Sequence, residues 1–172
     1  MGLLAHELEL QGFRSFTRNH YDRLLELRNL RVFRIQNMVM PVDGADISVI
    51  IAAWQHIASL HIPTTSSLPI NSLAFLAQNC SHLIDLEVTI STLGLPPFTT
   101  TPICAHPLHT LNVAKSGCLW ATLHIISWHL DRLFPRLCSL ITLKDGDESE
   151  WAKVQALLFM FQDARMHTPA QT

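Results

Sequence analysis

Apolar residues recur along this chain at nearly fixed distances, in the order apolar-x-x-apolar-x-x-apolar-x-apolar. The clearest copy consists of Cys80, Leu83, Leu86 and Val88. The second anchor of the pattern has six copies, at Ala5, Leu30, Ile57, Leu83, Leu108 and Leu137. Successive copies are therefore 25, 27, 26, 25 and 29 residues apart. A period of this size indicates a chain built from repeated structural units.

The second half of each copy alternates between apolar and polar residues, as a strand with one buried face does. We predict one strand per copy, including 30–35 and 56–62, with the last strand opening at Pro135. Amphipathic runs between the strands predict helices at 13–27, from Asp46 to Trp54, from Asn71 or Ser72 into Cys80, at 119–134 and at 151–165. Asp46 is expected to cap the second of these helices, and Asn71 or Ser72 the third. The segment 93–107 contains four prolines, which favour an extended or 3₁₀ conformation there.

One strand and one returning segment per repeat predict an α/β fold. The period favours a leucine-rich-repeat solenoid of about five to six irregular repeats. Such a solenoid is curved, with parallel strands on its concave face and helices on its convex face. We expect residues 1–172 to form one domain of this kind. No polar cap precedes the first copy, so we expect the domain to lack an N-terminal cap.

Composition narrows the possible functions. The mean hydropathy is +0.22, but no run reaches the roughly 18 apolar residues that a membrane span needs, so we expect no membrane partner. A net charge of −2 without a basic run gives little reason to expect nucleic acid. The N-terminus does not resemble a signal peptide, and a cytoplasmic or nuclear location is expected. The four cysteines, which form no close pair, are expected to be reduced core residues.

Catalytic and metal-binding motifs are absent from the sequence. Cys104, His106 and His109 come closest to metal-ligand spacing, but no second pair lies nearby to complete a zinc site. The chain has no nucleophile elbow and no glycine-rich phosphate loop. We therefore expect no enzymatic activity, no metal and no cofactor.

The alternation predicts which side chains form the concave face. If parallel strands stack in register, the outward positions of successive strands lie side by side. Surfaces of this kind bind proteins in solenoids. The predicted binding residues are Arg34, His61, Asp85, Glu87, Thr110, Asn112, Ile141 and Leu143. A partner across them would meet acidic groups in the middle and apolar groups at the far end, which favours a basic and hydrophobic segment.

The run Cys80-Ser81-His82-Leu83-Ile84-Asp85-Leu86, with its irregular copies and the segment from Ile126 to Leu137, resembles the leucine-rich-repeat portion of fungal F-box proteins. The resemblance covers nearly the whole chain. It implies a module that recognises the substrate of a ubiquitin ligase, while an F-box docks on the ligase adaptor. No F-box with a Leu-Pro-x-Glu start is visible here, so an adaptor partner is expected only if an F-box lies upstream.

This chain departs from the family pattern at the position after each strand, which usually holds Asn or Cys. We therefore expect the buried polar ladder to be incomplete and some coils to be irregular. The residues at these positions are Phe13, Met38, Thr65, Ser91, Ser116 and Asp145.

A second function class remains open on the sequence. Leucine-rich solenoids also act as regulators of small GTPases, of the activator type, where an exposed arginine near a strand end would matter. Arg34 is the one basic residue on the predicted concave strands. The family resemblance favours the ligase interpretation over this alternative.

Overall fold

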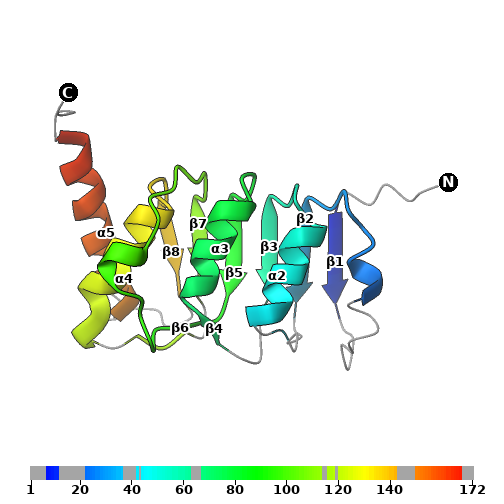
Figure 1. The fold of residues 1–172 in the computed structure, drawn as a ribbon, viewed down its shortest axis with the longest axis horizontal. Helices are drawn as coiled ribbons and strands as arrows, with labels where there is room; N and C mark the ends of the chain where they lie inside the picture. Colours follow the sequence, from blue (N-terminus) through cyan, green and yellow to red (C-terminus); the bar gives the residue numbers. More distant parts are fainter. Residues whose placement is uncertain are drawn as a thin grey trace.

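Six parallel strands form the main sheet of this protein (Figure 1). The computed structural model describes residues 7–11, 22–36, 42, 44–62, 67–113, 116–118, 120–142 and 150–167. The strands lie side by side in the order β1-β2-β3-β5-β7-β8. Their bounds are Glu7–Gln11 for β1, Val32–Gln36 for β2, Ser59–Ile62 for β3, Asp85–Val88 for β5, Thr110–Asn112 for β7 and Ser139–Ile141 for β8.

The register of this sheet follows the apolar pattern of the sequence. The third anchor of each copy pairs with the third anchor of the next. The aligned residues are Leu8, Phe33, Leu60, Leu86, Leu111 and Leu140. From Phe33 to Leu111 they are fully buried, because each is stacked between its counterparts on the neighbouring strands. The prediction of one parallel strand per copy, in this register, is confirmed.

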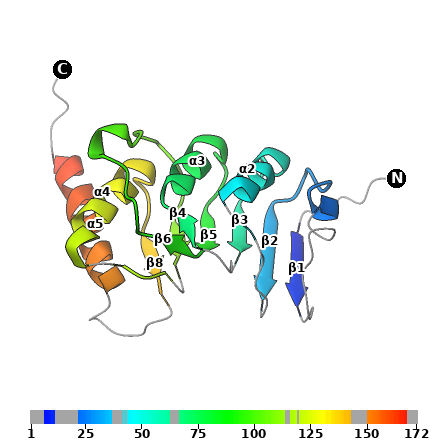
Figure 2. The ribbon, with the colours of Figure 1, turned by 60° about the horizontal axis from the view of Figure 1, so that its bottom comes forward.

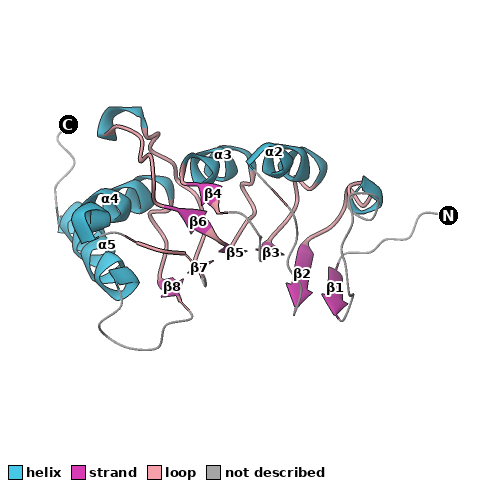
Figure 3. Cartoon of the chain, turned by 90° about the horizontal axis from the view of Figure 1, so that it is seen from below, coloured by secondary structure: helices cyan, strands magenta, loops and turns pink. Residues whose placement is uncertain are grey.

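Helices run between the strands and cover one face of the sheet (Figures 2 and 3). In Figure 3 the strands follow an arc, and the helices lie on its outer side. The helices are α2 at Gly44–Ala53, α3 at Asn71–Asn79, α4 at Leu123–Leu133 and α5 at Glu150–His167. Each turns apolar side chains toward the sheet, so strands and helices share one buried cluster that extends from Leu30 to Leu158.

Trp54 anchors the first part of this core. Its ring is fully buried and packs against Phe33 at a centroid distance of 4.8 Å. Its indole N–H donates to the backbone oxygen of Leu24 at 3.3 Å. A buried indole N–H needs such an acceptor, because an unsatisfied buried donor is costly.

The proline-rich segment interrupts the helical side of the repeat. It contains a short 3₁₀ turn, η1 at Phe98–Thr100, as the sequence predicts for this segment. His129 holds the segment against α4, since its buried ring contacts the Thr101 hydroxyl and the Pro96 carbonyl. Arg132 adds a bond from its Nε to the Thr101 carbonyl at 3.0 Å. The segment is thus fastened by side chains of α4 where no regular helix forms.

The incomplete polar ladder predicted at the position after each strand falls mostly on residues that are not described. Of the six positions, only Ser91 and Ser116 lie among the described residues. The Ser116 hydroxyl accepts from the backbone N–H of Ile90, one coil earlier, at 2.8 Å. Short strands β4 at Leu68–Pro69 and β6 at Ile90–Ser91 pair in parallel beside this contact.

Several local predictions are wrong. Asp46 lies within the first turn of α2 and does not precede the helix. The N-cap residue of α3 is Ile70, so neither Asn71 nor Ser72 caps it. Leu68–Pro69 is a short strand that the repeat pattern does not predict, and it pairs with β6.

The bounds of some helices and strands also differ from the sequence prediction. The 3₁₀ turn η2 at Trp120–Thr122 precedes α4, and the last strand begins at Ser139 rather than at Pro135. A helix is predicted at 13–27, and its residues 13–21 lie outside the described part of the chain. Of the remaining residues, Asp22–Leu24 are helical.

The cysteines differ in burial: Cys80 is buried, Cys104 and Cys118 are partly buried, and Cys138 is exposed. All four are free thiols, and Cys80 is fully buried. Burial raises the pKa of the Cys80 thiol to about 11. Cys138 is exposed, so the prediction that all four are core residues is wrong for this one. Its position just before β8 places it at the end of the stack, where fewer neighbours cover it.

Helix α5 closes the far end of the sheet. Its Gln155 side chain accepts from the backbone N–H of Leu140 in β8 at 3.1 Å. Its Gln162 amide donates to the Leu137 carbonyl at 3.0 Å, and Arg165 donates to the Pro135 carbonyl at 3.1 Å. These polar side chains satisfy backbone groups that an edge strand would otherwise leave to water.

Candidate functional site

The face of the sheet away from the helices carries two rows of side chains, and we call it the open face. The register sets both rows, because paired residues on parallel strands point the same way. The first row is Glu7, Val32, Ser59, Asp85, Thr110 and Ser139. The second row is Glu9, Arg34, His61, Glu87, Asn112 and Ile141.

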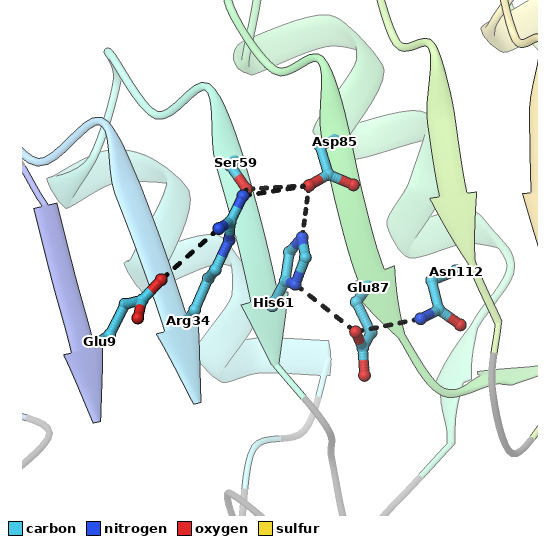
Figure 4. A network of polar contacts seen from close by, with 7 residues as sticks. All are labelled: Glu9, Arg34, Ser59, His61, Asp85, Glu87 and Asn112. Atoms are coloured by element: carbon cyan, nitrogen blue, oxygen red, sulfur yellow. Dashed lines mark hydrogen bonds and ion pairs between the residues drawn. The ribbon is translucent and has the colours of Figure 1, made fainter. Parts of the chain in front are cut away.

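Seven of these residues form a continuous polar network across five strands (Figure 4). Asp85 lies at its centre. Its Oδ2 atom is 2.5 Å from His61 Nε2, accepts from the Ser59 hydroxyl at 3.0 Å, and lies 3.8 Å from Arg34 Nη2. A single carboxylate oxygen therefore faces three partners, two of them on the neighbouring strand β3.

His61 links the two carboxylates of β5. Its Nε2 faces Asp85, and its Nδ1 lies 3.5 Å from Glu87 Oε2. One ring nitrogen thus faces each carboxylate, and His61 bridges the two.

The network ends on β1 on one side and on β7 on the other. Arg34 Nη1 is 3.5 Å from Glu9 Oε1 on β1, and Arg34 Nη2 donates to the Ser59 hydroxyl at 3.4 Å. At the other end, Asn112 Nδ2 donates to Glu87 Oε2 at 3.1 Å. Each contact joins residues about one repeat apart, so the network depends on the parallel register.

These side chains are partly accessible to solvent. The exposed side-chain fractions are 37% for Arg34, 22% for His61, 26% for Asp85 and 24% for Glu87. Partly exposed ion pairs contribute only about 0–1 kcal/mol each to stability. The network therefore does more to fix the directions of these side chains than to hold the fold.

The described open face is acidic. Its charged residues are Glu7, Glu9, Asp85, Glu87 and Arg34, which sum to −3 with His61 neutral and −2 with it protonated. Beyond the network, Ile141 of β8 is 44% exposed. The face thus combines an excess of carboxylates with an apolar side chain at one end.

Five of the eight residues predicted for this site belong to the polar network. Arg34, His61, Asp85, Glu87 and Asn112 lie in one network, as adjacent outward positions. Thr110 and Ile141 lie on the same two rows, and Leu143 lies outside the described residues.

Glu9 and Ser59 belong to the network but not to the predicted set. The repeat register is the signal that could have found them, because it places both at outward positions beside Arg34 and Asp85.

The pairing of Arg34 bears on the GTPase alternative. An arginine that acts on a GTPase must offer its guanidinium to the partner. Here the guanidinium contacts Glu9, Ser59 and Asp85 of its own chain. This geometry does not favour that alternative.

The described part of the chain shows neither a cluster of metal ligands nor a membrane-spanning helix. Within it, no three His, Cys, Asp or Glu side chains are placed to share a metal ion. None of its helices combines the length and the apolar character that crossing a bilayer requires.

Comparison with known proteins does not show to which family this chain belongs. No family model, no curated protein and no solved structure matches this chain.

Proposed function

We propose that this chain is a leucine-rich-repeat solenoid whose open face binds a segment of another protein. The observation that carries the proposal is the polar network that crosses five of the six in-register parallel strands, on the face that the described helices leave uncovered. Preorganised polar side chains favour binding, because less side-chain freedom is lost when a partner arrives. The resemblance of the repeats to those of fungal F-box proteins supports the same role.

The partner that fits this face is a basic segment with an apolar side chain at one end. The net negative charge attracts lysine or arginine, and complementary charge sets both the rate and the register of association. Ile141, exposed at the far end, offers an apolar contact. In an F-box protein such a segment would belong to the substrate that is presented to the ubiquitin ligase, and we propose that receptor role for the repeats.

A library of random peptides, selected against the full chain, tests this function. We expect enrichment of peptides that combine Lys or Arg with Leu, Ile or Phe. The double variant Asp85→Asn and Glu87→Gln should weaken the selected peptides by about ten-fold or more, since a hydrogen bond to a charged group is worth about 1.5–3 kcal/mol. Binding is measured by isothermal titration calorimetry.

The choice of isosteric amides follows from the structure. The sequence alone suggests that reversing both charges to lysine leaves stability unchanged. In the folded chain a lysine at position 85 would face Arg34 and His61, so we expect that reversal to destabilise the fold. Asn and Gln remove the charge and keep the shape.

The matched control is Asp163→Asn on α5, where the carboxylate is exposed and lies off the open face. This variant should bind the selected peptides as the wild type does. Equal affinity of the wild type and the open-face double variant would refute the proposal. The helix side would then be the next surface to test.

A further inference from the structure

A groove on the helix side, away from the open face, lies between α2 and α3. It has a volume of about 380 Å³. The two helices are neighbours on the same side of the sheet (Figures 1 and 2). Apolar atoms of Ile51 and Phe75 line part of the groove, and polar side chains line the rest, among them His56 and His82. This site is independent of the function proposed above.

The two histidines occupy equivalent places in successive repeats. Each lies two residues after a buried anchor, Trp54 or Cys80, just beyond the end of a helix. Stacking of the repeats brings their rings together, with centroids 5.8 Å apart and planes tilted by 45°. Both side chains are exposed, so solutes can reach them.

This separation suits two ligands of one metal ion. Metal–nitrogen bonds of about 2.0–2.1 Å, with a tetrahedral or wider angle at the ion, place the centroids of two imidazoles that share it roughly 5–6 Å apart. Imidazole nitrogen is a preferred ligand of Zn²⁺, Cu²⁺ and Ni²⁺. The distance between the two rings therefore lies in the range that a shared ion requires.

The helix ends provide a second, independent reason to expect a cation. α2 and α3 both end at this part of the groove, and neither has a basic residue in its last turn. The carbonyl groups of a helix C-terminus carry partial negative charge and favour a cation nearby. Two such ends converge beside His56 and His82, so positive charge is stabilised from both sides.

We propose that His56 and His82 bind a transition-metal cation, for which imidazole is the natural ligand, between two neighbouring repeats. Since the described residues hold no third His, Cys, Asp or Glu ligand placed to join them, the remaining positions take water or the amide oxygens of Gln55 and Asn79 at the groove. Asn79 donates its amide N–H to the Phe75 carbonyl at 2.8 Å, a bond that does not use its oxygen. The ion would add a link on the helix side between two repeats whose strands, β3 and β5, already pair.

Titration of the full chain with NiCl₂ tests the site. We expect one saturable Ni²⁺ site per chain by calorimetry, with imidazole NMR signals of His56 and His82 broadened first. Cu²⁺ should bind more tightly than Ni²⁺, as the order of affinities for nitrogen ligands requires. His56→Ala and His82→Ala should each lower the affinity by about ten-fold or more.

The control variant is His124→Ala, which removes an exposed histidine of α4 and should leave the affinity unchanged. Circular dichroism checks that each variant folds, and His82→Gln, which keeps a polar side chain, serves as a second variant at the same position. Absence of saturable binding in the wild type overturns the proposal. Binding that survives the loss of both histidines also overturns it, because the ion would then sit on other groups such as the exposed Cys138.

Discussion

Replacing Leu86 with alanine is expected to lower the free energy of unfolding by about 2–5 kcal/mol. Leu86 lies in the central part of β5 and is fully buried. It pairs with Leu60 on one side and Leu111 on the other. Truncation would leave a cavity that touches two neighbouring repeats, and close-packed interiors relax only partly around such a cavity.

The matched control is Ile84→Ala, which removes a similar volume two residues earlier in the chain. Ile84 is 49% exposed, so its truncation should change the free energy of unfolding by less than about 1 kcal/mol. Urea denaturation followed by circular dichroism measures both variants. A Leu86→Ala protein that unfolds at the same urea concentration as the Ile84→Ala protein would show that the repeats do not share one core.

The sequence carries the register of the fold because the pattern is periodic. Each apolar anchor must find its counterpart in the next repeat, and a shift of one residue would expose the whole set. Leu8, Phe33 and Leu60 could therefore be aligned from spacing alone. The β4–β6 pair could not, since Leu68 and Pro69 are too few to show an alternation and neither occupies an anchor of the repeat.

Helix starts escape prediction for a different reason. Asn71 and Ser72 are good capping residues by type, yet Ile70 takes the N-cap position of α3. The buried side chain of Ile70 belongs to the core, and packing there outweighs the contribution of about 1 kcal/mol that a side-chain cap makes. Tertiary packing thus decides a boundary that local preference leaves open.

The candidate site, like the fold, could be predicted from the sequence only in part. Spacing alone places Arg34, His61 and Asp85 on one face, because alternation and register fix the direction of each side chain. Spacing does not tell which of them meet. Those contacts depend on side-chain rotamers. They show that the carboxylates of the open face are not free but partly paired with Arg34 and His61.

His106 is a buried polar residue whose loss should affect stability strongly. Its side chain is 3% exposed. Nδ1 accepts from the backbone N–H of Leu108 at 3.1 Å, so the proton of the neutral ring is on Nε2, which donates to the Cys80 carbonyl at 2.7 Å. The ring also packs edge-on against Phe134, with centroids 5.2 Å apart. One side chain thus satisfies two backbone groups that belong to different repeats.

We expect His106→Ala to lower the free energy of unfolding by roughly 2–5 kcal/mol, because it leaves two buried backbone groups unsatisfied and opens a cavity. His106→Gln should cost less, since its amide offers one donor and one acceptor. Urea denaturation at pH 8 measures both. Equal stability of the alanine and glutamine variants would mean that packing, and not hydrogen bonding, is what His106 supplies.

Because His106 is buried, the stability of the folded chain should depend on pH. Burial lowers the pKa of His106 in the folded chain below its usual 6.5, and the bond to Cys80 opposes this shift in part. Burial likewise lowers the pKa of His129, where the bond to the Pro96 carbonyl opposes the shift and Arg132 adds to it. The unfolded chain therefore binds these protons more readily than the folded chain. Stability should be fully present above about pH 6.5 and decline as the pH falls below it, by up to about 1.4 kcal/mol per pH unit for each histidine.

His106→Gln separates the contribution of this histidine from that of His129, because glutamine does not titrate. Between pH 7 and pH 5 its stability should fall less steeply than that of the wild type. His124→Gln, which replaces an exposed histidine, should follow the wild-type slope. If His106→Gln lost stability as steeply as the wild type over this range, protonation of Nδ1 would not compete with the Leu108 N–H, and the tautomer assigned to His106 from its two hydrogen bonds would be wrong.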